Sequence, residues 1–298
     1  MVRLMSKFEK LLEDGKFVIT AEIAPPKGID FTKVKESAEL LRGKVDAINV
    51  TDFQLSMMRA TSLATCKVIK DMGLDPILQM TGRDRNRIAL QGEMLSAGVF
   101  GIENILAITG DHTSLGDHPQ AKAVFDLDSV GILQAGKKLT SGFDMSGNEL
   151  KGTPEFYFGA AISPGHSNLN LQIMKMRKKI ITGAKFFQTQ AVFDIEVMRY
   201  FREITKDMDY KILCGVLPLK SPRMARMMNE KIPGIFVPED QIERLESVGK
   251  ENWKTEGLKI TAELIKKLKS EELCDGIHIM TIGAEDRIPE LLEYADLL

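Results

Sequence analysis

The sequence is poor in cysteine and in aromatic residues. Its 298 residues include only 3 Cys and 1 Trp, and Phe, Trp and Tyr together make up 6%. Cys66, Cys214 and Cys274 are odd in number, widely spaced and set in apolar or helical surroundings. A disulfide framework needs paired cysteines and a structural zinc site needs closely spaced ones, so the sequence favours neither. We therefore expect a protein of the reducing cytoplasm.

An excess of charge of one sign is missing as well. Lys and Arg number 40 against 42 Asp and Glu, and the formal net charge is -2. Non-specific nucleic-acid binding depends on a basic surface, so we do not expect it here. No stretch approaches the roughly 18 apolar residues of a membrane span, and residues 1–14 lack the hydrophobic region of a signal peptide. We expect neither membrane insertion nor secretion.

Common metal and nucleotide motifs are also absent. The four histidines, His112, His118, His166 and His278, show no HxH or HExxH spacing, which disfavours a metal site. The glycines fit neither the GxGxxG pattern of Rossmann folds nor the GxxxxGK[ST] pattern of P-loops.

What the chain does have is a regular alternation of short β-rich runs with amphipathic stretches, repeated about eight times. The runs expected to be strands are 17–23, 47–51, 76–80, 104–109, 157–161, 186–190, 211–216 and 276–282. Helices are expected near 31–42, 61–72, 84–97, 125–139, 169–182, 194–205, 221–229 and 287–295. This pattern predicts an α/β fold, a (β/α)8 TIM barrel formed by a single domain over residues 1–298. A loop near 140–155 and extra outer helices near 238–247 and 252–269 complete the prediction.

In such a barrel the functional groups lie at the carboxyl ends of the strands. Glu22 precedes a Pro-Pro turn at the end of the first strand, where a carboxyl group partly removed from water suits general acid chemistry. Asp111 follows Gly110, which permits a tight bend that directs the carboxylate into the mouth of the barrel. Each also has a structural interpretation, as an ion-paired glutamate and as a turn aspartate.

Two amides form a further candidate. Strand alternation puts Gln188 and Gln190 on one face and Thr189 on the other. Inward amides offer a donor and an acceptor, as recognition of a pterin or flavin ring requires. An ordinary polar layer of the barrel is the alternative. The helical spacing of Met224, Met227 and Met228 favours packing over cofactor binding.

Six short motifs stand in order along the chain: 21–26 (Ala-Glu-Ile-Ala-Pro-Pro), 49–52 (Asn-Val-Thr-Asp), 78–86 (Leu-Gln-Met-Thr-Gly-Arg-Asp-Arg-Asn), 106–111 (Leu-Ala-Ile-Thr-Gly-Asp), 189–194 (Thr-Gln-Ala-Val-Phe-Asp) and 215–218 (Gly-Val-Leu-Pro). Through them the sequence resembles the flavin-dependent 5,10-methylenetetrahydrofolate reductases from about residue 17 to residue 295. Each motif is short, but six of them in order at barrel strand ends form a specific signal.

The resemblance implies a TIM-barrel enzyme that reduces 5,10-methylenetetrahydrofolate to 5-methyltetrahydrofolate. Glu22 would be the general acid, Asp111 would lie near the flavin and the pterin, and Gln190, with Gln188, would bind the folate ring. The flavin would be FAD or FMN. Its contacts would come from Thr51, Gln79, Asp111, His166, Lys178 and Lys179, with the two lysines near the flavin phosphate.

This sequence departs from the family pattern where electrons enter. Pro222 stands where many relatives carry a Phe that stacks on nicotinamide, and Gln79 replaces a frequent His beside the flavin. These departures imply that a partner subunit donates the electrons and that the chain is part of a homo- or hetero-oligomer. The alternative function is a pterin-binding methyltransferase barrel that moves a methyl group between tetrahydrofolate and an acceptor. A third alternative is a folate-binding subunit that depends on another chain for electrons.

Overall fold

Eight parallel strands close into a barrel in the computed structural model, which describes residues 5–281 and 283–298. The strands follow one another around the barrel in sequence order, β1 to β8, and β8 pairs with β1. They are β1 Val18–Ile23, β2 Ala47–Val50, β3 Pro76–Thr81, β4 Asn104–Ile108, β5 Tyr157–Ile162, β6 Phe186–Ala191, β7 Lys211–Val216 and β8 Gly276–Ile279. The predicted (β/α)8 barrel is confirmed.

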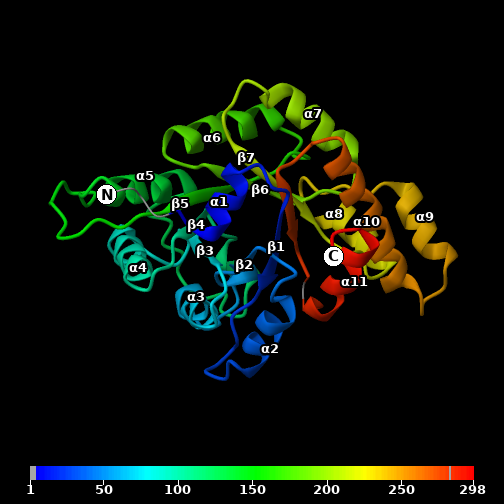
Figure 1. Cartoon of the computed structure of the whole chain (residues 1–298), viewed down its shortest axis with the longest axis horizontal. Coiled ribbons are helices and arrows are strands. Elements are labelled where there is room, and N and C mark those ends of the chain that lie inside the picture. Colours follow the sequence, from blue (N-terminus) through cyan, green and yellow to red (C-terminus); the bar gives the residue numbers. More distant parts are fainter. Residues whose placement is uncertain (1–4, 282) are drawn as a thin grey trace.

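Helices surround the barrel (Figure 1). They are α1 Lys7–Glu13, α2 Thr32–Leu41, α3 Ser62–Asp71, α4 Arg87–Val99, α5 Ser129–Thr140, α6 Leu169–Ile181, α7 Ile195–Thr205, α8 Pro222–Lys231, α9 Glu239–Ser247, α10 Trp253–Ser270 and α11 Ile288–Tyr294. The expected outer helices are α9 and α10. None of the helices in the described part of the chain combines the length and the apolar character that crossing a bilayer requires.

Some predicted boundaries are wrong, and local chemistry explains why. Helix α4 begins at Arg87 rather than at 84 because the Asn86 side chain accepts hydrogen bonds from the amides of Ile88 and Ala89. Helix α5 begins at Ser129 rather than at 125, since Asp128 caps it and Phe125 has a φ of 43°. Strand β8 ends at 279, and position 282 of the predicted strand lies outside the described residues.

Helix α1, which the sequence did not predict, lies across the amino-terminal end of the barrel (Figure 1). Its Phe8 and Leu12 are fully buried and pack on a layer of inward side chains, Val18, Ala47, Ile77, Leu106, Tyr157, Phe186 and Leu213. The Phe186 ring reaches so close to Gly159 that a Cβ there would lie 2.3 Å from it. This apolar layer forms the floor of the barrel.

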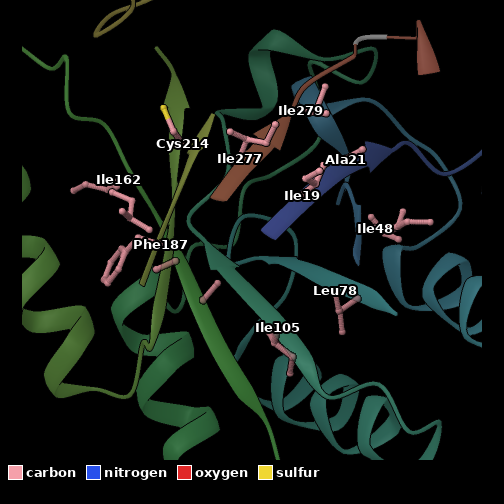
Figure 2. Packing of buried hydrophobic residues seen from close by; sticks show 14 of the residues in the cluster. Ile19, Ala21, Ile48, Leu78, Ile105, Ile162, Phe187, Cys214, Ile277 and Ile279 are labelled. Atoms are coloured by element: carbon pink, nitrogen blue, oxygen red, sulfur yellow. The ribbon is translucent and has the colours of Figure 1, made fainter. Parts of the chain in front are cut away.

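Outward-facing residues of the same strands are apolar throughout. Ile19, Leu78 and Ile105 belong to the main hydrophobic cluster between barrel and helices, and Figure 2 shows Leu78 and Ile105 pointing toward the helices. The inward positions behave differently, because they change from apolar to polar toward the carboxyl ends. On β1, for example, Val18 is followed two and four residues later by Thr20 and Glu22. Polar groups therefore gather at one end of the barrel.

Candidate active site

A cavity of about 380 Å³ opens above the floor, at the carboxyl end of the barrel. Its polar lining comes from six strands or the loops after them: Glu22, Gln54, Gln79, Asp111, Gln188, Thr189, Gln190 and His278. Leu106, a member of the apolar floor, closes it below. The structure thus brings five of the predicted site residues, Glu22, Gln79, Asp111, Gln188 and Gln190, to one cavity.

The Glu22 carboxylate is held through one of its two oxygens. His278 Nε2 lies 3.2 Å from Glu22 Oε1, and Gln79 Nε2 donates a hydrogen bond to the same oxygen at 3.4 Å. In the described part of the chain, Glu22 Oε2 has no hydrogen-bond partner. The Glu22 side chain is 14% exposed to solvent. One oxygen is therefore fixed by the protein and the other is available to a molecule in the cavity.

A second layer of contacts orients His278, which is 2% exposed. Its Nδ1 lies 3.2 Å from the amide nitrogen of Asn49 and 3.0 Å from Thr20 Oγ1. An amide nitrogen only donates, so Nδ1 accepts and the proton of the neutral ring resides on Nε2, facing Glu22. Parallel pairing of β8 with β1 sets Thr20 opposite His278 and so fixes the arrangement.

Sequence analysis missed this role of His278, because a lone histidine without metal spacing is usually structural. The signal that was available is its position. It is the polar residue in the apolar run Gly276–Ile279, on the inward face of the last strand and near its carboxyl end.

Asp111 reaches the cavity through the bend that the sequence predicts. Gly110 has a φ of +91°, in the left-handed region that glycine adopts without strain. The guanidinium of Arg83, which is 1% exposed, donates to the Asp111 carbonyl oxygen at 3.2 Å. This contact fixes the backbone beneath an exposed carboxylate.

The two amides come from an irregular stretch of β6. The pairing of β6 with β7 shifts register between Gln188 and Ala191, which indicates a bulge. Simple alternation therefore fails at Thr189, which lines the cavity together with Gln188 and Gln190. The amide nitrogen of Gln188 is buried without a hydrogen-bond partner. A buried donor of this kind is costly unless a ligand pairs with it.

Four predicted cofactor residues do not line this cavity: Thr51, His166, Lys178 and Lys179. Thr51 is buried at the end of β2, and its hydroxyl has no partner. His166 lies half-buried in the loop after β5, and Lys178 is exposed on α6. Lys179 reaches back from α6 and donates to the carbonyl oxygen of Ala161, a cavity residue, at 2.7 Å. Burial, together with the charge of Lys175, lowers the pKa of Lys179 to about 8.

One wall of the cavity is rich in sulfur. Met224, Met227 and Met228 of α8 line it together with Met280, the residue after β8. The sequence favoured packing for the α8 methionines, and Met228 is indeed buried in a hydrophobic cluster against which Met224 packs. The three side chains also border the cavity. Within the described residues, no Phe, Tyr or Trp lines this cavity, so thioethers together with aliphatic side chains such as Leu106 and Leu217 form the apolar surface against which a planar ring would lie.

No group of three or more His, Cys, Asp or Glu side chains within 5–281 and 283–298 is arranged to hold a metal ion.

Comparison with known proteins gives the same family along nearly the whole chain. The family model described as methylenetetrahydrofolate reductase matches residues 7–296. A 5,10-methylenetetrahydrofolate reductase of Pectobacterium carotovorum is 26% identical over 278 residues, which cover 90% of this chain and 87% of the relative. A probable methylenetetrahydrofolate reductase (NADPH) of Caenorhabditis elegans is 20% identical, with 99% of this chain and 44% of the relative covered.

Solved structures share the fold. An uncharacterized protein from Clostridium thermocellum, which binds two copies of 5-methyl-5,6,7,8-tetrahydrofolic acid, has a TM-score of 0.64 at 18% identity, with 98% of this chain and 97% of that chain covered. A 2,3-dimethylmalate lyase has a TM-score of 0.53 at 10% identity, with 99% and 86% covered. These likenesses show the barrel architecture. The match of the family model over residues 7–296 confirms the resemblance found in the sequence, and the chain belongs to the methylenetetrahydrofolate reductase family.

Proposed function

We propose that this chain reduces 5,10-methylenetetrahydrofolate to 5-methyltetrahydrofolate in the cavity above the barrel floor, with the help of a bound flavin. The observation that carries the proposal is the one-sided anchoring of Glu22. His278 and Gln79 hold its Oε1, so that Oε2 faces the cavity that Asp111, Gln188 and Gln190 also line. A carboxyl group held in this way can deliver a proton to one defined atom of a ligand.

The proton goes to N10 of the bridged folate. Its arrival lets the bond between N10 and the methylene carbon break, and the electron pair of that bond stays on N10. The resulting N5 iminium cation is stabilised by the carboxylate of Asp111. Gln190 and Gln188 hydrogen-bond the ring edge and fix its orientation. A reduced flavin, when bound, would supply the hydride that the methylene carbon needs to become a methyl group.

The residues present fit a flavin at this end of the barrel. Two buried polar atoms have no partner, Thr51 Oγ1 at the end of β2 and Gln188 Nε2 on β6, and both are of the kind that a heteroaromatic ring edge satisfies. Thr51, Gln79 and Asp111 would hold the ring system. His166, Lys178 and Lys179 would lie along the phosphate-bearing chain of FAD or of the shorter FMN.

The lining of the cavity also supports electron delivery by a partner subunit. Stacking of nicotinamide is commonly provided by an aromatic side chain, and none lines the described cavity. Pro222 is buried at the first turn of α8, where its ring helps to start the helix. The polar side chains of the cavity can contact a folate. Among the described residues, however, no aromatic side chain lines the cavity on which the nicotinamide of NADH or NADPH could stack. A cytoplasmic hetero-oligomer would supply the electrons.

An anaerobic titration of the purified chain tests the proposal. We expect a visible flavin spectrum that 5-methyltetrahydrofolate or a reduced dye bleaches, and that NADH and NADPH leave unchanged. A colourless chain that still transfers a methyl group from 5-methyltetrahydrofolate would instead indicate the methyltransferase alternative. Bleaching by NADH at turnover rates would remove the need for a partner.

Replacing His278 with Leu tests how Glu22 is oriented. The change removes the donor that faces Glu22 Oε1 but leaves Gln79 in place. We expect kcat to fall by about tenfold, as for the loss of one hydrogen bond to a charged group, with little change in KM and an altered pH profile of kcat. Stopped-flow kinetics with the reduced enzyme, recorded over a range of folate concentrations and pH values, measure kcat, KM and the pH profile. A fall in folate affinity at unchanged kcat would contradict the positioning role.

Lys179 gives the proposed cofactor site a pH dependence. An ammonium group attracts the flavin phosphate, and it loses its charge as the pH rises through the pKa of about 8. We expect the affinity of the wild type for FMN or FAD to fall as the pH rises through this pKa. The Lys179→Met variant should bind the flavin about tenfold more weakly than the wild type at low pH, and its affinity should not change with pH in this way. Quenching of flavin fluorescence between pH 6.5 and 9.5 measures it. Lys185→Met, an exposed lysine before β6, is the control, and a step that persists in Lys179→Met would rule Lys179 out.

A further inference from the structure

A second cavity, of about 210 Å³, lies at the carboxyl ends of β7 and β8 but on the outer side of the barrel wall. Ile279 and Thr281 line it, whereas His278 and Met280, which alternate with them, line the candidate active site. Successive residues of an extended segment face opposite sides, so the end of β8 separates the two cavities. A molecule in the outer cavity is therefore not the molecule that meets Glu22.

The floor of the outer cavity is apolar. Leu258 from α10 with Ile288 and Leu291 from α11 are 3%, 1% and 0% exposed and form its base. Cavities that hold drug-sized ligands begin at roughly 300 Å³. The volume here suits a compact apolar body of about one small ring.

Positive charge predominates around this floor. Three cations, Lys220, Lys254 and Arg287, line the cavity with a single carboxylate, that of the exposed Asp286. The Arg287 guanidinium is engaged, since its Nε donates to Glu290 Oε2 at 2.6 Å. Lys254, on the first turn of α10, has no ion pair or hydrogen bond from its side chain to any described residue.

The two lysines act on each other. Partial burial, and next the charge of Lys254, lower the pKa of Lys220, while Glu285 and Asp286 oppose this effect. Two ammonium groups that share one cavity repel each other, and an anion placed between them relieves the repulsion. A phosphate has the charge and the number of acceptor oxygens to accept hydrogen bonds from both.

The position of the outer cavity in the fold also favours an anion as its ligand. In TIM barrels, phosphate groups frequently bind between the loops that follow the seventh and eighth strands. Here Lys220 is in the loop after β7, and Gly283, Ala284 and Asp286 are in the segment after β8. We propose that the outer cavity binds a small phosphorylated molecule, with its phosphate between Lys220 and Lys254 and its apolar body on Leu258 and Leu291.

Calorimetric titration of the full-length chain with phenyl phosphate, in a buffer free of phosphate and sulfate, tests this site. Phenyl phosphate combines an anion with one compact ring. We expect one molecule to bind per chain, more tightly than inorganic phosphate or phenol alone. Lys254→Ala should weaken binding by about tenfold or more, as expected for a charge-assisted hydrogen bond. Lys254→Arg should retain most of the affinity. Lys259→Ala, an exposed lysine of the same helix that does not line the cavity, should bind like the wild type.

A competition arm separates the outer cavity from the candidate active site. Saturation with 5-methyltetrahydrofolate should leave the affinity for phenyl phosphate unchanged. Displacement by the folate would place the anion in the inner cavity and overturn the proposal. So would the absence of binding to the wild type, or equal losses in Lys254→Ala and Lys259→Ala. None of these readouts requires turnover, so a failure of the proposed reductase activity would not obscure them.

Discussion

Glu22→Gln is expected to abolish folate reduction almost completely while flavin remains bound. The amide oxygen of Gln can still accept hydrogen bonds from His278 and Gln79, so the side chain keeps its place. The protons of its amide group are not acidic enough to be transferred to N10, and loss of a positioned general acid costs about 10² to 10⁴ in rate. Single-turnover oxidation of the dye-reduced enzyme by 5,10-methylenetetrahydrofolate measures this step directly.

Two observations complete the Glu22 experiment. Glu285→Gln is the matched control, because Glu285 lies after β8 at the same end of the barrel and outside the inner cavity, where it accepts a hydrogen bond from Thr281. This variant should turn over at nearly the wild-type rate. If Glu22→Gln also did so, another group would have to be the acid and the mechanism proposed above would be wrong.

Phe8→Ala is expected to destabilise the fold by about 3 to 5 kcal/mol, the range for removing a fully buried Phe. Its ring is 0% exposed and makes edge contacts with Phe186 at 5.1 Å and Tyr157 at 6.0 Å between ring centroids. Because α1 is short, its helix depends on this packing more than on its own propensity. The free energy of unfolding from urea titration gives the value.

Phe143→Ala is the control for the floor of the barrel. Phe143 is 42% exposed, in the loop after α5, so its truncation removes little buried area and should cost well under half as much. Equal losses for the two variants would mean that α1 does not hold the barrel together. A smaller urea dependence for Phe8→Ala, with the midpoint retained, would point to a change in compactness instead.

The barrel itself could be predicted because its signal is repeated. Each strand is a short apolar run and most of the helices begin at a residue whose side chain caps them, so errors at single boundaries leave the alternation intact. Helix α1 could not be found in this way. It has only 7 residues, of mixed charge and apolar character, and what stabilises it is Phe8 and Leu12 against side chains from distant strands.

The sequence predicts those residues of the candidate site that stand at the carboxyl end of a strand. It does not predict those whose place in the site depends on the pairing of strands that are distant in sequence. Glu22 and Asp111 stand at such ends and reach one cavity. His278 meets Glu22 only because β8 closes onto β1, a contact across 256 positions of sequence. The bulge that brings Thr189 to the cavity arises from the pairing of β6 with β7, which a single-strand pattern does not contain.

The sealed floor has a kinetic consequence. Since Phe8 and the aromatic layer fill the amino-terminal end, the inner cavity is reached from the carboxyl-terminal end. Oxidised and reduced folate must exchange along the same route and occupy the same volume. The leaving folate therefore has to depart before the next one enters, and 5-methyltetrahydrofolate should act as a competitive inhibitor whose residence time sets an upper limit on the rate of turnover.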